Sequence, residues 1–600
     1  MTQRPSVESG TNLDSRLQGR KWWKESVIYQ VYPRSFQDTN GDGIGDLDGI
    51  TARLDYIKGL GANLIWICPM YKSPRSDYGY DISDYYTVAE EYGTNNDLYN
   101  LIATAKSKGI GILLDLVINH TSDEHEWFQK ALRDPDSKYR GYYFFKRGID
   151  GRPPNNWRSY FGGSAWEAVP NEPDMFYLHA FSKKMPDLNW ENAEMREELY
   201  SMINWWVEKG IAGFRIDAIM NIKKTMIEGV VQPDGDDGLV SINKYIINQP
   251  GIKDLLRGLK DNTFAKHQNI MTLAEAAVPD DQLEDFVGPD GFFDMSFDFR
   301  AADIDIPESG EWYRPTDWTV NELRDTLLDV QTGVQRRGCW GATYFENHDQ
   351  NRSINKYFRR RREDISDVTK KLLATVLLGF RGTPVVYQGE EIGMENIQLS
   401  SIDRYEDVNT HSQYDAGIAA GMDPRDVFRL VSYRSRDNSR TPMQWDGDSE
   451  NAGFTTPRGR PWLPVNPNYR VINVDDAVDD KNSVYHHYRR LIELRTGNHK
   501  YKHVFVYGET VPKFVHVDNV IAYERVWGDQ SILILANFQK KPVDLPLDDS
   551  QHLRGKKILI SNYDDDDGVD VDVVVAAAAN KMTILPYQAL IVDLTTQHPN

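Results

Sequence analysis

The segment GFRIDA, residues 213–218, places Arg215 and Asp217 two positions apart. Its short, apolar and aromatic character predicts a β-strand, and side chains two apart on a strand point to the same face. If that face is the interior, neither charge can be buried alone, because an unpaired buried charge is costly. A guanidinium beside the carboxylate would keep Asp217 ionised, which is the state that a carboxylate nucleophile needs.

Glu275 lies in a contrasting setting, within the apolar run MTLAEAAV at 271–278. Loss of hydration in such a run would raise the pKa of Glu275 toward the value that a general acid needs near neutral pH. Two carboxyl groups whose pKa values are driven apart are typical of glycoside hydrolysis, and the retaining version needs them about 5 to 5.5 Å apart. A buried salt-bridge network without catalysis is the alternative.

Other acidic, amide and histidine side chains follow further strand-like runs. Asn119 and His120 end the run that begins GILLDLV, and His348 and Asp349 end the run ATYFENHD. Each of these residues alone is more often structural than functional. Several at the ends of separate strands favour one shared site.

Eight strand-like runs alternate with helical patterns, and these elements must position the site. Apolar residues recur at helical spacing in 50–61, 97–109 and 196–210, and each of these segments ends at glycine. Strands and helices in alternation predict parallel strands, and eight units predict an α/β fold of the (β/α)8 TIM barrel type. An open, doubly wound sheet is the alternative. The runs are VIYQVYP (27–33), NLIWICP (63–69), GILLDLVIN (111–119), GFRIDA (213–218), IMTLAEA (270–276), FFDMSFDF (292–299), ATYFENH (342–348) and TPVVYQG (383–389).

The spacing of these runs predicts the domain organisation. More than 90 residues separate the third and fourth runs, which predicts a small inserted domain at 119–187 around the stretch NNWRSYFGGSAW. From 515 onward, short strands with turns (VIAYERVW, SILILANF, KKILISNY, ALIVDL) predict a C-terminal antiparallel β-sandwich at 515–600. The barrel would comprise 21–118 and 188–514, after a polar tail at 1–20. The acidic run Asp564 to Asp567 fits a solvated turn.

The composition restricts the classes of function. A formal net charge of -21 over 600 residues argues against nucleic-acid binding, which requires a basic surface. The amino-terminal segment lacks the apolar core of a signal peptide, and no apolar run is long enough to cross a membrane. We therefore expect a cytoplasmic protein with no membrane partner. Cys68 and Cys339, the two cysteines, lie in apolar runs and are expected to be buried, reduced thiols.

The segment DTNGDGIGD at 38–46 alternates oxygen-bearing side chains with small residues. Its first six positions fit the start of an EF-hand loop. Gly49 stands where that motif needs glutamate, and the run before the loop predicts a strand instead of a helix. The oxygens suit a hard cation, although the EF-hand module is excluded. A turn held by Asx hydrogen bonds is the alternative.

Several blocks resemble those of the α-amylase superfamily, glycoside hydrolase family 13. They are DLVINH (115–120), GFRIDA, the strand with Glu275, and FENHD (345–349). The segments KWWKESVIYQVYPRSF, MPDLNW (185–190) and SRDNSRTPMQWD (435–446) are similar to its oligo-1,6-glucosidase and α-glucosidase subfamily. The resemblance covers nearly all of the chain from Trp22 onward. It implies a retaining, exo-acting α-glucosidase that acts on short oligosaccharides such as maltose, isomaltose or sucrose, with no organic cofactor.

The same resemblance implies roles for single residues. It makes Asp217 the nucleophile, Glu275 the general acid/base and Asp349 a third carboxylate that holds sugar hydroxyls. The residues that would bind glucose are His120, Arg215 and His348 around the attacked sugar, and Asp77, Tyr80 and Arg436 at its non-reducing end, with Asp407 supporting Arg436. The implied structural metal is Ca2+, or Mg2+ as a second choice, with Asp38, Asn40, Asp42, Asp46 and the carbonyl of Ile44 as its ligands.

Two departures from the subfamily bear on specificity. Ala218 follows the nucleophile where enzymes strict for α-1,6 bonds carry valine, which favours α-1,4 or mixed activity. Residues 299–303 (FRAAD) stand where sucrose isomerases carry a charged loop, which disfavours isomerisation. A sucrose isomerase or transglucosylase with the same site is the alternative, and a non-catalytic transporter heavy chain is a remote one. We expect a monomer or weak homodimer whose partner is a small oligosaccharide.

Overall fold

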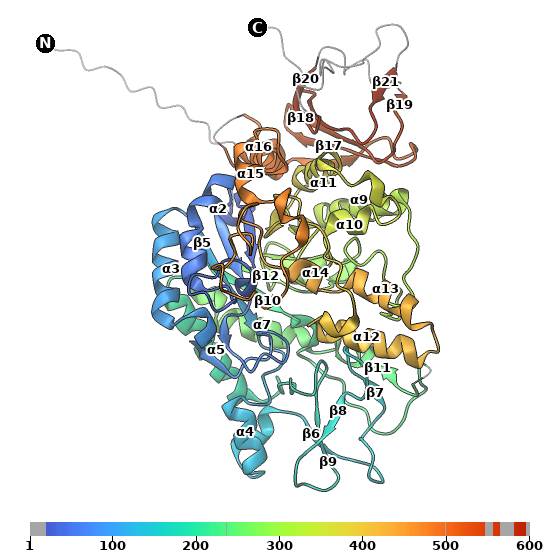
Figure 1. Ribbon diagram of the computed structural model, residues 1–600. Helices are drawn as coiled ribbons and strands as arrows, with labels where there is room; N and C mark the ends of the chain where they lie inside the picture. The colour runs from blue at the N-terminus through green and yellow to red at the C-terminus, as the bar shows by residue number, and fades with distance from the viewer. Residues whose placement is uncertain (1–19, 236, 498–499, 547–555, 564–580, 596–600) are drawn as a thin grey trace, which may run out of the picture.

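The computed structural model describes residues 20–235, 237–497, 500–546, 556–563 and 581–595. Its centre is a sheet of eight parallel strands, one for each predicted run, which confirms the predicted (β/α)8 fold (Figure 1). The first nineteen residues of the predicted tail and the acidic run Asp564 to Asp567 lie outside the described residues. The strands are β1 (Ile28–Val31), β2 (Leu64–Ile67), β5 (Gly111–Val117), β10 (Gly213–Asp217), β12 (Met271–Ala274), β13 (Met295–Ser296), β14 (Ala342–Thr343) and β15 (Thr383–Tyr387).

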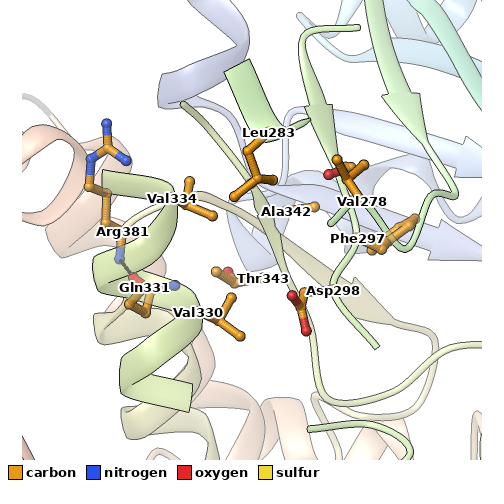
Figure 2. Close-up of a pocket in the computed structure, with 12 residues that line it drawn as sticks. Val278, Leu283, Phe297, Asp298, Val330, Gln331, Val334, Ala342, Thr343 and Arg381 are labelled. Carbon is orange, nitrogen blue, oxygen red and sulfur yellow. Dashed lines mark hydrogen bonds between the residues drawn. The ribbon is translucent and has the colours of Figure 1, made fainter. Parts of the chain in front are cut away.

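The strands follow one another around the barrel in chain order, and each hydrogen-bonded pair is parallel. Between β13 and β14 the ring is closed by a single parallel bridge, Ser296 to Gly341. A cavity of about 30 Å³ lies at this seam, between the two strands and α9 (Val320–Arg336) (Figure 2). The buried hydroxyl of Thr343, which lines it, has no hydrogen-bond partner among the described residues. None of the predicted site residues lines this cavity, so it is a packing gap at the closure of the barrel.

Alternation along each strand separates the interior of the barrel from its outer layer. Trp66 and Leu113 belong to the interior apolar cluster, whereas their chain neighbours Ile65 and Leu114 pack in the cluster that includes the surrounding helices. The same alternation directs Asp217, at the carboxyl end of β10, toward the barrel axis. The barrel interior is therefore apolar along most of the strands and charged at their carboxyl ends, which form the mouth of the barrel.

The predicted helical segments are helices, with one difference. Segments 97–109 and 196–210 form α3 (Asn95–Ser107) and α5 (Ala193–Glu208). Segment 50–61 forms two short helices, α1 (Leu47–Ala52) and α2 (Leu54–Leu60), which meet at Arg53. Further helices around the barrel and above its mouth are α7 (Ile252–Asn262), α8 (Leu283–Val287), α11 (Asp367–Gly379), α12 (Val408–Ala419), α13 (Pro424–Arg434), α14 (Asp437–Arg440) and α16 (Val484–Thr496).

Between β5 and β10 the chain forms a separate small sheet. Strands β6 (Phe145–Arg147), β9 (Met175–Leu178) and β8 (Trp166–Ala168) are antiparallel neighbours. Nearby, β7 (Trp157–Arg158) pairs with β11 (Val240–Ser241), which comes from the segment after β10. Trp157, Trp166 and Val240 share one apolar cluster, so the segment after β10 is packed together with the insertion.

The C-terminal strands form two antiparallel sheets, at the opposite end of the molecule from β6, β8 and β9 (Figure 1). Val520, Leu535, Leu545 and Ile584 belong to one apolar cluster contributed by both sheets, as a sandwich requires. The larger sheet has β16 (Glu509–Pro512), β17 (Val520–Trp527), β18 (Gln530–Asn537), β22 (Ala589–Asp593) and β20 (Lys557–Ser561), and the smaller has β19 (Val543–Pro546) and β21 (Lys581–Ile584).

Two sequence expectations concern the chain as a whole. Cys68 and Cys339 are both buried and free, which confirms the expected reduced thiols. Within the described part of the chain, no helix is both long and apolar enough to span a bilayer.

Candidate active site

Arg215 is the centre of a first group of charges at the mouth of the barrel. Its Nη1 donates to Oδ1 of Asp217 at 2.8 Å and to Oδ1 of Asp115 at 2.7 Å. Its Nη2 lies 2.9 Å from Oε2 of Glu275. The two carboxylates predicted to be catalytic are therefore held side by side by the two terminal nitrogens of one guanidinium, which is only 2% exposed.

Strand register brings this group together. Asp115 on β5 is the direct partner of Arg215 on β10, so both side chains point into the barrel from adjacent strands. Asp115 also accepts hydrogen bonds from the indole of Trp66 and the hydroxyl of Tyr80, each at 3.1 Å. Sequence reasoning missed Asp115, although an acidic side chain inside the apolar run GILLDLV was a usable signal.

Burial raises the pKa of Asp217 well above its usual range, although Arg215 opposes this. Glu275 and Asp115 add to the rise, because one guanidinium is shared among three carboxylates. The expectation that Arg215 holds Asp217 ionised is therefore incomplete. Burial likewise raises the pKa of Asp115, so both aspartates retain protons more readily than isolated carboxyls.

Glu275 lies in a more polar setting than the run MTLAEAAV predicts. Its side chain is 25% exposed, and Oε2 also accepts the backbone N–H of Ala218 at 2.9 Å. Ala218 has a left-handed backbone with φ of 41°, a conformation that non-glycine residues adopt at some cost. The sequence-based expectation of an apolar environment for Glu275 is wrong. Its carboxylate contacts two polar donors, the Arg215 guanidinium and the backbone N–H of Ala218.

Arg436 is the centre of a second group. Its Nη2 lies 3.0 Å from Oδ1 of Asp77, and its Nε donates to Oδ1 of Asp407 at 2.8 Å. We call these three residues the clamp. Nη1 of the same arginine reaches Oδ1 of Asp349 at 3.2 Å, and Arg440, one turn along α14, donates to that oxygen at 2.8 Å.

Asp349 and Asp407 differ from Asp217 in their electrostatics. Burial opposes ionisation of Asp349, but His348, Arg436 and Arg440 outweigh it and hold the pKa of that carboxyl well below its usual range. Burial likewise opposes ionisation of Asp407, and Arg436 with Arg440 lowers its pKa. These carboxylates are therefore fixed as anions and as hydrogen-bond acceptors.

His348 and His120 differ in charge, because the first is a cation and the second is neutral. Burial disfavours the cation of His348, but Asp349, whose Oδ2 lies 3.0 Å from Nε2, raises its pKa to about 10. Burial lowers the pKa of His120 to about 4, so its ring is neutral, and Nε2 donates to the carbonyl of Tyr80 at 3.2 Å. The amide nitrogen of Gln30 lies 2.9 Å from Nδ1 of His348, and its amide oxygen has no hydrogen-bond partner among the described residues. Turning this amide so that its oxygen and nitrogen exchange places lets the oxygen accept a hydrogen bond from the protonated ring.

Three aromatic residues that could stack on a sugar, Tyr80, Phe161 and Trp166, lie in different places. Tyr80 is buried and stacks on His348 with ring centroids 5.2 Å apart. Phe161 is half-buried, and the Arg436 guanidinium lies 5.6 Å from its ring. Trp166 is buried in the core of the insertion, where its indole donates to Asn155, so it is not part of the site.

Two further residues escaped the sequence prediction. Arg440 stands four positions after Arg436, a spacing that places both on one helical face and could have been recognised. Lys224 is fully buried and lies 2.9 Å from Asp187 and 2.7 Å from Oδ1 of Asn119. The amide nitrogen of that asparagine lies 3.2 Å from Nδ1 of His120. Lys224 therefore fixes the orientation of the amide beside His120, a long-range contact that no local pattern reveals.

The loop at 38–46 is held by hydrogen bonds from its own backbone. Asp38 accepts from the N–H groups of Asn40, Gly41 and Gly43, and the side chain of Asp46 caps α1 by accepting from Gly49. The predicted ligands are all oxygen donors, which suits Ca2+. Among the described residues, however, no three His, Cys, Asp or Glu side chains come together as a metal site. Calcium binding here stays a prediction.

An eight-stranded barrel with paired carboxylates at its mouth defines a glycoside hydrolase site. The chain matches the family described as alpha amylase, catalytic domain, over residues 30–504, and the family described as maltogenic amylase, C-terminal domain, over residues 513–562. The protein therefore belongs to the alpha-amylase family and is a glycoside hydrolase.

Relatives within the family have different substrates in their names. The chain is 42% identical over 557 residues to an oligo-1,6-glucosidase of Parageobacillus thermoglucosidasius, covering 92% of this chain and 96% of the relative. The crystal structure of Bacillus licheniformis trehalose-6-phosphate hydrolase superposes with a TM-score of 0.84 at 37% identity, covering 96% and 100%. The crystal structure of the trehalulose synthase MutB of Pseudomonas mesoacidophila MX-45 superposes with a TM-score of 0.85 at 37% identity, covering 95% of this chain and 99% of that chain.

Proposed function

We propose that the protein is a retaining, exo-acting α-glucosidase that releases glucose from the non-reducing end of short α-glucosides. The observation that carries the proposal is the pairing of Asp217 and Glu275 on one guanidinium, together with the clamp. The paired carboxylates supply the chemistry of bond cleavage. The clamp supplies charged acceptors and donors for the hydroxyls of a terminal glucose and closes that end of the pocket.

The reaction would proceed by double displacement. In the first step, Asp217 attacks the anomeric carbon while protonated Glu275 donates its proton to the leaving glycosidic oxygen. In the second step, Glu275 removes a proton from water, which releases glucose from Asp217 with its α configuration retained. This mechanism requires a proton on Glu275 and an ionised Asp217 when the substrate is bound.

The remaining residues would orient the sugar. Asp349 is held as an anion by Arg436, Arg440 and His348, so it can accept hydrogen bonds from sugar hydroxyls without taking up a proton. His348 is a cation and can donate to a sugar hydroxyl, and neutral His120 is fixed by its hydrogen bond to the carbonyl of Tyr80. Fixed groups of this kind lower the cost of orienting the substrate for attack.

The alternative is a sucrose isomerase or transglucosylase, in which a sugar replaces water in the second step. The similarity to a trehalulose synthase structure supports this alternative. Residues 299–303 read FRAAD, and in this structure Arg300 is paired with Asp298 at 2.8 Å instead of presenting a free charge to the mouth of the barrel. This pairing favours hydrolysis.

Product analysis separates these reactions. We would supply maltose, isomaltose, sucrose and trehalose 6-phosphate in turn and follow the first product by NMR. The proposal predicts α-glucose from at least one of the three unphosphorylated disaccharides. Isomaltulose or trehalulose as the main product from sucrose would replace hydrolysis by isomerisation, and β-glucose as the first product would contradict retention.

A further inference from the structure

Tyr78 and Glu406 are the chain neighbours of the clamp acids Asp77 and Asp407, and they make a second contact between the same two segments. The hydroxyl of Tyr78 donates to Oε2 of Glu406 at 2.7 Å. The two contacts lie at different depths, because Asp407 is fully buried and Asp77 is 5% exposed, whereas Glu406 is exposed. The Tyr78–Glu406 contact therefore lies on the solvent side of the clamp.

Both partners of this outer contact are held in place. The ring of Tyr78 lies 5.1 Å from that of Trp462, with the Arg34 guanidinium 5.6 Å away, and its backbone is left-handed with φ of 47°. A non-glycine residue keeps such a conformation only where the surroundings enforce it. The backbone N–H of Glu406 donates to Asp437 at 2.6 Å. Burial and the Glu406 carboxylate raise the pKa of Tyr78, so its hydroxyl remains a donor at any physiological pH.

The position of this contact decides what can lie beyond the terminal glucose. Its two residues are 328 positions apart in the chain, so the hydrogen bond joins segments that sequence does not connect. A sugar extended at its non-reducing end would have to pass between these segments, outside the clamp. A hydrogen bond to an ionised carboxylate is strong enough to oppose their separation.

We propose that Tyr78 and Glu406 are specificity-determining residues that form an outer latch over the clamp. The latch keeps Asp77 and Arg436 in position for one terminal glucose and excludes sugars that carry a further unit at that end. This inference rests on the proposed exo-acting α-glucosidase and goes beyond it by naming the residues that enforce its exo action.

Tyr78→Phe and Glu406→Ala test the latch, each alone and together. Tyr78→Phe removes only the hydroxyl and keeps the ring against Trp462. Tyr86→Phe is the matched control, because Tyr86 is an exposed tyrosine on β4 (Asp84–Val88) in the same part of the chain. Two quantities are measured: kcat and KM on p-nitrophenyl α-glucoside, and the first products from p-nitrophenyl α-maltoside. Release of maltose from the maltoside requires a sugar that extends beyond the clamp, whereas release of glucose does not.

We expect each latch variant to raise KM about three- to tenfold with little change in kcat, since the loss is one of binding. The same variants should increase the maltose fraction severalfold, and the double variant should do no more than the larger single change, because both substitutions break one bond. Tyr86→Phe should match the wild type in both assays.

Wild-type values of KM and of the maltose fraction in all latch variants would overturn the inference, and a lowered melting temperature alone would assign the contact to stability. Strictly additive effects in the double variant would also contradict a shared latch. If the wild type is active and the latch variants match it in both assays, the latch is overturned and the proposed function stands. A wild type inactive on p-nitrophenyl α-glucoside would overturn the proposed function and the latch together.

Discussion

Two arginines organise the mouth of the barrel, and each contacts three carboxylates, but the surrounding charge differs. The group of Arg215 contains Asp115, Asp217 and Glu275, with Arg215 as the cation that contacts all of them. The group of Arg436 contains Asp77, Asp349 and Asp407, together with Arg440 and protonated His348.

This difference in charge explains the difference in pKa. Three acids against one guanidinium leave an excess of negative charge, and burial then raises the pKa of Asp217. Three acids against three cations are balanced, and the pKa values of Asp349 and Asp407 are lowered. In the proposed reaction, the group that would move a proton and the group that would hold hydroxyls therefore contain the same residue types in different ratios.

The largest effect should come from removing the carboxyl group of Glu275, the proposed general acid/base. Glu275→Gln keeps the size of the side chain but cannot donate or accept that proton, so kcat/KM on maltose should fall about 10³- to 10⁴-fold. On p-nitrophenyl α-glucoside the loss in the first step should be smaller, because nitrophenolate leaves without protonation. Steady-state and burst kinetics measure both, and azide should restore turnover in the second step. Equal losses on both substrates without azide rescue would contradict the role of Glu275.

Exchanging each arginine for lysine should separate the two groups. An ammonium cannot contact three carboxylates in the fixed geometry of a guanidinium. Arg436→Lys should raise KM on p-nitrophenyl α-glucoside about 10- to 100-fold with a smaller change in kcat, whereas Arg215→Lys should mainly lower kcat. Arg314→Lys, at a half-exposed arginine that pairs with Glu311, is the control. The same pattern of kcat and KM in both variants would remove the distinction between the groups.

The balanced group should also show a defined pH dependence of stability. The pKa of His348 is raised from 6.5 to about 10 in the folded protein, so its contribution is complete below pH 6.5 and is lost as the pH rises through about 10. The melting-temperature difference between wild type and His348→Gln should therefore be largest near pH 6.5 and shrink toward pH 10. Thermal denaturation at a series of pH values measures it. A difference that grows with pH would show that the ring is neutral in the folded state.

The smallest effect should be on the loop at 38–46, which contributes no residue to either group. If the loop binds Ca2+, chelation with EDTA should lower the melting temperature by a few degrees and leave kcat unchanged at low temperature. Added calcium should restore the melting temperature, and EDTA should not change the melting temperature of the Asp42→Asn variant. An unchanged melting temperature would assign the loop to Asx hydrogen bonds alone.

The sequence predicts the parts of the fold that depend on local pattern. Apolar runs located all eight strands, and the spacing of Arg215 and Asp217 predicted their shared direction because side chains alternate along a strand. Because His120, His348 and Asp349 follow the carboxyl ends of other barrel strands, they were predicted to share one site with Arg215 and Asp217. The resemblance placed Asp77, Tyr80, Arg436 and Asp407 near that edge, and the structure does bring them together.

Contacts set by register and tertiary approach could not be predicted in the same way. The pairing of Asp115 with Arg215 depends on how two strands align, and that of Lys224 with Asp187 on how the insertion folds back. The polar setting of Glu275 depends on a left-handed backbone at Ala218, to which the sequence gives no clue because alanine rarely adopts it. The electrostatics of the site were therefore the least predictable part.

Trapping the covalent intermediate tests the central claim most directly. With 5-fluoro-α-glucosyl fluoride the second step is slow, so the glucosylated protein should accumulate and be visible by mass spectrometry. Our account predicts one fluoroglucosyl group per chain, on the peptide that contains Asp217, and none on the Asp217→Asn variant. A label on Glu275 or another carboxylate, or turnover without any covalent adduct and with β-glucose as the first product, would contradict it.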